Sequence, residues 1–302
     1  MRIGIDLGGT KIEAIAMGAH GETLARDRLA TPTVYVDILT TLTGLVHEME
    51  SRFGKIPRVG IGTPGAISPA TGLMKNAHNT ALQGKPFAAD MATRLGHEVR
   101  VANDADCFTL SEATDGAGAD ASGVFGVIVG TGTGGGLVID RGLRRGKNGI
   151  CGEWGHNQLP WLREDEWPGP PCNCGKTGCI ETFLSGPGMA RDHERATGEA
   201  LPAVAISKGA SAGDSDCIAT LDRYYDRMAR ALASVINIFD PEVIVLGGGV
   251  SKIENIYTQV PQRWGNYVFS DRVATRLLPN HFGDASGVRG AAWLWPAESE
   301  TS

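Results

Sequence analysis

The chain has 302 residues, of which 42% are hydrophobic, so it can bury a sizeable core and form two domains of ordinary size. Its formal net charge is -6, and no basic run is longer than Arg144-Arg145, which argues against a nucleic acid partner. No stretch approaches the roughly 20 apolar residues that a membrane-spanning helix needs, and Met1 runs directly into a strand pattern without a leader. We therefore expect a cytoplasmic protein with no membrane partner.

The N-terminal part of the chain alternates strand and helix patterns. Polar and apolar residues alternate from Arg2 to Asp6 and again from Ile12 to Ile15, which predicts a β-hairpin with a glycine-rich tip. A third strand is expected near Glu22 to Arg28. Apolar residues then recur at helical spacing from Ile38 to Phe53, and Gly54 ends that helix. Further on we expect strands over Val59 to Gly62 and Val99 to Ala102, and a helix over Phe87 to Leu95.

The second half repeats the opening pattern. A strand over Phe125 to Val129 leads into the glycine-rich run Gly130 to Gly136 and then into a strand over Leu137 to Ile139. The strongest helix pattern runs from Leu221 to Phe239, and a buried strand follows over Val243 to Leu246. Strands that alternate with helices on this scale predict an α/β protein whose sheets are covered by helices. We place a lobe boundary near residue 115, where the sequence becomes rich in Gly, Ala and Asp.

Three glycine-rich turns each follow a predicted strand, namely Asp6 to Lys11, Gly130 to Gly136 and Gly247 to Gly249. Residues without a Cβ let backbone N–H groups approach phosphate oxygens, which is why glycine gathers at nucleotide sites. None of these turns is a P-loop or a complete dinucleotide fingerprint, and each alone is more often an ordinary tight hairpin. Three in one chain, two of them opening matching hairpins, favour a nucleotide ligand.

An acidic residue, Asp6, stands beside the first glycine turn and would repel phosphate unless a cation lay between them. Magnesium, held through water by this carboxylate and by the phosphates, is the natural mediator. Alternatively, Asp6 caps the turn by accepting hydrogen bonds from backbone N–H groups. Thr10 and Lys11 either contact phosphate or lie on the hairpin surface.

Two further carboxylates, Asp104 and Asp106, follow the strand that ends at Ala102, at the strand end where α/β proteins usually build their sites. Either one can act as a general base that takes a hydroxyl proton during phosphoryl transfer. Asp106 also fits the N-cap of a helix that starts at Cys107. We therefore assign the base to Asp104.

Other polar groups lie near predicted turns and suit the hydroxyls of a sugar, each of which donates and accepts hydrogen bonds. They are Gly65 in Gly62-Thr63-Pro64-Gly65, Asn79 in the segment Asn76 to Asn79, Glu153 and Glu181. Alone, each is more often a solvated loop residue.

Three cysteines, Cys172, Cys174 and Cys179, crowd into a segment that is rich in Gly and Pro. Their spacing fits a tetrahedral zinc site that staples a loop without a core of its own, and His156 completes a Cys3His set. The alternative is three reduced cysteines packed as small hydrophobic residues, but little stands around them to pack against. With four protein ligands the zinc is structural and fixes the loop between Glu153 and Glu181.

Seven motifs stand in a fixed order along essentially the whole chain. They are Asp6-Leu7-Gly8-Gly9-Thr10-Lys11, Asn103-Asp104-Ala105, Gly130-Thr131-Gly132, Glu153-Trp154-Gly155-His156, Cys172-x-Cys174-Gly175-x2-Gly178-Cys179-x-Glu181, Val245-Leu246-Gly247-Gly248-Gly249 and Gly287-Val288-Arg289-Gly290-Ala291-Ala292. With this set the chain resembles the ROK family of bacterial sugar kinases and repressors, and within that family the fructokinases.

The resemblance implies a two-lobed, actin-like and hexokinase-like α/β fold of the ribonuclease H-like ATPase type, with ATP and sugar in the cleft between the lobes. The small lobe would cover 1–115 and be joined by a C-terminal helix over 288–302, and the large lobe would cover 116–287. Family members commonly dimerise, so a homodimer is expected.

The resemblance also assigns roles. Asp104 is the base, and Asn103, Glu153, His156 and Glu181 contact the sugar, with His156 also binding zinc. Gly65 and Asn79, from the polar turns above, are further candidate sugar contacts. ATP is bound by Asp6, Gly8, Gly9, Thr10, Lys11, Gly130, Thr131, Gly132, Thr133, Gly134, Gly247, Gly248 and Gly249. One departure is Asp106, where many relatives carry Asn, because its charge would raise the pKa of Asp104 if the two side chains met.

Three classes of function stay open. The first is an ATP-dependent kinase of fructose, which the run Asn157-Gln158-Leu159-Pro160-Trp161 favours because it looks like that of the fructokinases. The second is a kinase of N-acetylglucosamine, N-acetylmannosamine, glucose or mannose. The third is a sugar-responsive repressor or a sugar-binding protein without activity. A repressor needs an N-terminal helix-turn-helix, whereas here the first glycine hairpin begins at Arg2.

Overall fold

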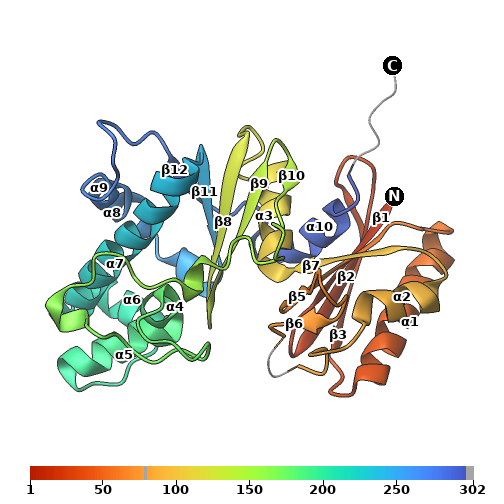
Figure 1. Ribbon diagram of the computed structural model, residues 1–302, viewed down its shortest axis with the longest axis horizontal. Coiled ribbons are helices and arrows are strands. Elements are labelled where there is room, and N and C mark those ends of the chain that lie inside the picture. The colour runs from red at the N-terminus through yellow and green to blue at the C-terminus, as the bar shows by residue number, and fades with distance from the viewer. Residues whose placement is uncertain (78–79, 297–302) are drawn as a thin grey trace. The chain divides into compact units, whose positions relative to one another are not determined.

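The computed structural model describes residues 1–77 and 80–296, and the chain divides into two compact units (Figure 1). The first unit comprises Met1–Ala119, Gly136–Cys151 and His281–Ser302, and the second comprises Asp120–Gly135 and Gly152–Asn280. These units differ from the predicted lobes mainly at 136–151, which we had assigned to the second lobe. Gly136 explains the difference, because it lies so close to the preceding helix, Asp104–Thr114, that a Cβ there would overlap Thr109 Oγ1.

The first unit contains a five-stranded sheet in the order β3-β2-β1-β4-β7. β1, β2 and β3 are antiparallel neighbours, whereas β4 and β7 run parallel to β1. The predicted hairpin, third strand and two later strands are all present. Their bounds are β1 (Arg2–Leu7), β2 (Lys11–Met17), β3 (Thr23–Ala30), β4 (Val59–Thr63) and β7 (Val99–Asn103), and a small separate sheet pairs β5 (Ala66–Ile67) with β6 (Met74–Lys75).

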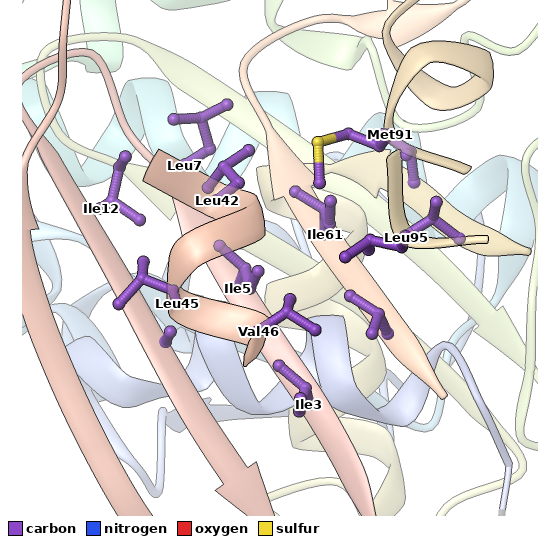
Figure 2. Packing of buried hydrophobic residues seen from close by; sticks show 14 of the residues in the cluster. Ile3, Ile5, Leu7, Ile12, Leu42, Leu45, Val46, Ile61, Met91 and Leu95 are labelled. Carbon is purple, nitrogen blue, oxygen red and sulfur yellow. The ribbon is translucent and has the colours of Figure 1, made fainter. Parts of the chain in front are cut away.

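Helices α1 (Tyr35–Phe53) and α2 (Phe87–Leu95) cover one face of this sheet. Figure 2 shows Ile3, Ile5 and Leu7 of β1 packed against Leu42 and Leu45 of α1, and all five side chains are buried. Alternate residues of a strand point to the same face, so the odd-numbered apolar residues of β1 build this core.

The opposite face of the sheet is covered by α10 (Ser286–Trp293), which also packs on α3 (Asp104–Thr114). Here backbones meet directly, because a Cβ at Gly4 would overlap Val288 O and a Cβ at Gly60 would overlap Ala291 O. The C-terminal segment thus packs on the N-terminal sheet, but its helix ends at Trp293. The predicted helix over 288–302 was too long, and 297–302 lie outside the described residues.

The second sheet has the order β10-β9-β8-β11-β12, with bounds β8 (Gly123–Val129), β9 (Thr133–Ile139), β10 (Gly142–Leu143), β11 (Val243–Gly247) and β12 (Arg276–Pro279). β8, β11 and β12 are parallel. β9 begins at Thr133, four residues before the predicted start, so the second glycine turn is confined to residues 130–132. Gly135 lies within β9. The ring of Trp154 occupies the space where a side chain would stand, since a Cβ at Gly135 would lie 2.8 Å from Trp154 Cδ1.

The helices of the second unit pack on α7 (Ser215–Phe239), the longest in the described part of the chain. It begins six residues before the predicted start, because the Asp214 side chain caps it by accepting hydrogen bonds from the N–H groups of Asp216 and Cys217. None of the helices in the described residues is long and apolar enough to cross a membrane. The remaining helices are α4 (Ile180–Leu184), α5 (Gly186–Thr197), α6 (Ala203–Ser211), α8 (Ile256–Gln259) and α9 (Pro261–Trp264), with short 3-10 helices at Trp154–His156, Glu164–Glu166, Gly249–Lys252 and Gly283–Ala285.

The backbone contact at Gly60 can be tested against a glycine that has free space around it. Gly60→Ala should lower the free energy of unfolding by about 1–3 kcal/mol, because the added methyl group overlaps the Ala291 carbonyl. Gly44→Ala is the matched control, since Gly44 lies in α1 with no atom within 4 Å of its Cβ position, and it should raise stability by about 0.5–1 kcal/mol. Chemical denaturation of the three proteins measures both effects. Equal stability of the wild type and Gly60→Ala would contradict the contact.

Candidate functional site

The predicted site residues fall into two groups, one in each unit. In the first unit, Gly8, Gly9 and Thr10 form the exposed turn between β1 and β2. The Gly8 N–H donates to Lys11 O (2.9 Å) and closes the turn. Thr31 holds it from the side, because its N–H donates to Thr10 O (3.0 Å) and its hydroxyl donates to Gly8 O (2.8 Å). The turn is therefore fixed before any ligand binds.

Lys11 stands at the base of this turn beside a buried carboxylate. Its ammonium lies 3.7 Å from Glu13 Oε2, and its side chain is half exposed. Glu13 also accepts hydrogen bonds from Arg26 Nε and Arg28 Nε, each at 2.7 Å. Three cations thus surround one carboxylate next to the glycine turn. Sequence analysis missed Glu13 and the two arginines because their pairing depends on strand register.

Two acidic groups of the first unit influence each other. Burial, together with the charges of Asp104 and Glu13, raises the pKa of Asp6 to about 6, although the charge of Lys11 opposes this rise. Carboxylates in a shared electronegative region fit the oxygen ligands that Mg²⁺ prefers, directly or through water. The residues present therefore suit the magnesium ion predicted beside Asp6.

Asp104 is the first residue of α3, directly after β7, and it is exposed. Asn103 is the N-cap, and its Oδ1 accepts a hydrogen bond from the Ala105 N–H (2.9 Å). Its Nδ2 donates to Gly65 O (3.2 Å), so the structure brings Asn103 and Gly65 together. Asp106, which we expected to be the N-cap, is instead a buried residue of the first helical turn. The helix starts three residues earlier than predicted because β7 leads into it without a loop.

Another predicted sugar contact, Asn79, lies outside the described residues.

In the second unit, Glu181 on α4 lies against the second glycine turn. Its Oε2 accepts a hydrogen bond from the Thr133 N–H (2.9 Å), and a Cβ at Gly132 would lie 2.7 Å from the same oxygen. The Gly130 carbonyl accepts from the Gly186 N–H (2.8 Å) at the start of α5. A predicted sugar contact and a predicted phosphate turn are therefore in direct contact, which the sequence alone did not indicate.

Trp154 fixes the segment that carries Glu153 and His156. Its indole Nε1 donates to Gly134 O (3.1 Å), and its ring meets Phe125 edge-on with centroids 5.8 Å apart. Gly134, a predicted ATP contact, is a residue of β9, and its carbonyl accepts this hydrogen bond. Because the Trp154 side chain is buried and anchored in this way, the nearby motif residues Glu153 and His156 are held in place.

The predicted metal ligands come together. The ligand atoms of His156, Cys172, Cys174 and Cys179 all lie within 4.8 Å of one another. His156 Nδ1 is 3.6 Å from Cys172 Sγ, and Cys174 Sγ is 3.6 Å from Cys179 Sγ. Ligands about 2.3 Å from a tetrahedral ion are about 3.8 Å apart, so this spacing fits zinc. The nitrogen that faces the cysteines is Nδ1, which leaves Nε2 for another partner.

A buried ion network joins the loop between His156 and the cysteines to α7. Glu166 Oε1 is 2.8 Å from Arg227 Nε and 2.7 Å from Arg230 Nη2, and all three side chains are buried. Burial opposes ionisation of Glu166, but the arginines outweigh it and lower its pKa to about 2. Arg230 also donates to Trp161 O (2.8 Å). Sequence analysis missed this network, because its partners are more than sixty residues apart.

A cavity of about 800 Å³ lies beside Gly130 and Thr131 in the second unit. Gly249 forms part of the cavity wall. It follows the sharp turn at Gly248, whereas Gly247 is still part of β11. The wall is mainly apolar, as expected for the site of an aromatic base. Sequence analysis missed the helical part of the wall, and the remaining lining residues are Gly186, Pro187, Ala190, Pro202, Ala203, Val204, Ser207, Lys208, Val250, Lys252 and Ile253.

The sequence model of the ROK family matches residues 2–298. This chain belongs to the ROK family. It is 41% identical over 299 residues to the N-acetyl-D-glucosamine kinase of Pectobacterium carotovorum subsp. carotovorum (strain PC1), which covers 97% of this chain and 98% of that protein. It is 39% identical to the N-acetyl-D-glucosamine kinase of Vibrio cholerae serotype O1, with 97% and 99% covered.

Solved ROK structures share the fold. The crystal structure of a ROK hexokinase from Thermus thermophilus superposes with a TM-score of 0.85 at 28% identity, covering 96% of both chains. A ROK glucokinase from Streptomyces griseus, in complex with glucose and AMPPNP, gives a TM-score of 0.78 at 28% identity over 97% of this chain and 98% of that one. The predicted α/β fold and family are thus confirmed. The narrower resemblance to fructokinases is not, because the two relatives above are named as N-acetyl-D-glucosamine kinases.

Proposed function

We propose that this ROK protein is an ATP-dependent hexose kinase and that N-acetylglucosamine is its foremost candidate substrate. The observation that carries the proposal is the placement of Asp104, an exposed carboxylate at the end of β7, next to Asp6 and the first glycine turn. The similarity to N-acetyl-D-glucosamine kinases over nearly the full length supports the substrate.

In the proposed reaction, Asp104 accepts the proton of a sugar hydroxyl. The hydroxyl oxygen forms a bond to the γ-phosphorus of ATP as the bond from that phosphorus to the ADP oxygen breaks. The Asp104 side chain suits this role because it is exposed and its helix begins at that residue, which holds the carboxylate near the positive end of α3.

Each unit offers a candidate contact for the nucleotide. The apolar cavity beside Gly130 and Thr131 suits the adenosine, and the Asp6 to Lys11 turn suits the terminal phosphates. The glucokinase of Streptomyces griseus, which binds AMPPNP, supports a nucleotide in this fold. Asp6 would hold Mg²⁺ through water, and the ion would neutralise charge on the phosphates.

Sugar binding is proposed for Asn103, Gly65, Glu153, His156 and Glu181, with Asn79 as a further candidate. His156 would bind zinc through Nδ1 and a sugar hydroxyl through Nε2, so the metal would orient the ring. A homodimer, implied by the family resemblance, belongs to the same proposal.

Fructose is the second candidate substrate. The run Asn157-Gln158-Leu159-Pro160-Trp161 favours it, and this run directly follows His156. In the structure Leu159 is buried, and Arg230 fixes the Pro160 and Trp161 carbonyls, so the run is a rigid neighbour of the proposed sugar contact.

A panel of sugars tests the substrate. ADP release from Mg-ATP should be fastest with N-acetylglucosamine, compared with N-acetylmannosamine, fructose, mannose and glucose at equal concentrations. If fructose gives the highest kcat/KM, the proposed kinase function stands and fructose replaces N-acetylglucosamine as the preferred substrate. An absence of turnover with all five sugars would contradict the proposed function.

Replacing the base tests the mechanism. Asp104→Asn should lower kcat by about 100-fold or more, because an amide cannot take the hydroxyl proton, while the sugar still binds. Coupled ADP release and calorimetric titration with the preferred sugar measure the two effects. Asp37→Asn, at an exposed first-turn position of α1, is the control and should retain wild-type kcat. An Asp104→Asn protein with wild-type turnover would remove Asp104 from the mechanism.

The zinc proposal is tested by metal content and by mutation. Purified protein should carry stoichiometric zinc, and Cys172→Ser should lose it together with sugar affinity, because the loop between Glu153 and Glu181 is no longer fixed. Cys151→Ser, outside the cluster, should keep both properties. Elemental analysis and calorimetry provide the measurements. Full sugar affinity in a zinc-free protein would show that the metal does not orient the sugar site.

A further inference from the structure

A buried carboxylate, Glu112, gathers three separate segments of the first unit. It lies at the end of α3 and is fully buried. Its Oε2 accepts hydrogen bonds from the Ala117 N–H and the His281 N–H, each at 2.9 Å. Its Oε1 accepts from the Ser286 hydroxyl at 2.7 Å. Ala117 follows α3, whereas His281 and Ser286 belong to the segment that leads into α10.

These contacts are strong and directional. An ionised carboxylate in a dry environment is costly unless its oxygens accept several hydrogen bonds, and charge-assisted hydrogen bonds are shorter and stronger than neutral ones. Because each oxygen of Glu112 accepts hydrogen bonds from particular donors, the carboxylate fixes the positions of those donors. Ser286 is the first residue of α10, and the start of that helix is therefore fixed by α3.

The next residue, Gly287, lies against Asp6. A Cβ at Gly287 would be 3.2 Å from Asp6 Oδ2, which is closer than ordinary van der Waals contact. Farther along α10, a Cβ at Gly290 would overlap the Cys107 carbonyl of α3. The helix can therefore shift toward neither neighbour, and its first turn forms one wall around the Asp6 carboxylate.

We propose that Glu112 is a positioning residue that seats the first turn of α10 against Asp6 and so fixes the carboxylate that faces the Mg-ATP phosphates. The inference rests on the proposed function for the ligand of Asp6. It adds a residue that touches neither nucleotide nor sugar. Glu112 acts through Ser286 and Gly287 rather than through the reacting atoms.

The first test replaces the carboxylate with an amide. In Glu112→Gln, one oxygen becomes an NH₂ group that faces donors, so at least one partner loses its acceptor. We expect the free Mg²⁺ concentration for half-maximal rate to rise about tenfold, as is typical when a residue that orients a metal ligand is lost. Calorimetric titration with Mg-ATP in the absence of sugar should show a similar loss of affinity, and the KM for sugar should stay within about twofold.

A structural effect alone gives a different pattern. If Glu112→Gln only lowers the fraction of folded protein, kcat falls while the Mg²⁺ requirement and the Mg-ATP affinity of the folded fraction stay unchanged. Glu50→Gln is the matched control, because Glu50 also accepts a backbone N–H, from Ile56 (3.1 Å), at the end of a helix. It should retain the wild-type Mg²⁺ requirement. Hydrogen exchange over residues 281–290 should accelerate in Glu112→Gln and not in Glu50→Gln.

A second variant approaches Asp6 from α10. Gly287→Ala leaves Glu112 intact, and alanine favours helix over glycine, so the protein should fold. The added methyl group must displace the Asp6 carboxylate or the helix, and we expect the same rise in the Mg²⁺ requirement. This variant keeps the proposal testable if Glu112→Gln does not fold.

The outcomes separate this inference from the proposed function. A wild type that binds Mg-ATP but phosphorylates no sugar removes the hexose kinase function, and the titrations of the variants still decide the role of Glu112. Wild-type Mg-ATP affinity in both Glu112→Gln and Gly287→Ala overturns the positioning role. A wild type that does not bind Mg-ATP overturns both proposals.

Discussion

The first unit depends on one constraint, which is that the backbone of α10 contacts the backbone of the N-terminal sheet directly. Gly4 and Gly60 let α10 lie directly on β1 and β4, and Gly290 lets the same helix lie on α3. Asp6 shares the face of Gly4, two residues along the strand, so the approach of α10 also places a helix terminus beside this carboxylate. The C-terminal segment, far away in sequence, thereby becomes part of the environment of the first glycine turn.

The same packing explains the electrostatics of this group. Burial is the largest cause of the raised pKa of Asp6, and the nearby charges of Asp104 and Glu13 add to it, while Lys11, Arg26 and Arg28 pair with Glu13. Such an arrangement is costly without a cation and becomes favourable when one binds, because a divalent ion neutralises like charges held close together. These groups would therefore suit a metal–phosphate complex better than phosphate alone.

Local patterns predicted the elements well, and distant contacts account for what they missed. Alternation and helical spacing identified the hairpins, α1, α2 and β11, because burial on one face leaves a period in the sequence. The start of β9 was missed because glycines at its beginning have no side chain, and the Trp154 ring that fills the space lies some twenty residues away. Asp104 and the cysteine cluster could be named as candidates because a strand end and cysteine spacing are local signals. Glu112 could not, since its partner Ser286 is 174 residues distant.

In the second unit, the short helix α4 links the cysteine cluster, a proposed sugar contact and the second glycine turn. Cys179 precedes α4 and belongs to the metal cluster, and Glu181, two residues later, is a proposed sugar contact whose carboxylate accepts the Thr133 N–H beside the second glycine turn. A change at the cluster must therefore alter the position of Glu181, because too few bonds separate them to absorb it. It must also alter the hydrogen bond to Thr133. A metal bound by the cluster would therefore influence both the proposed sugar contact and the second glycine turn through one carboxylate.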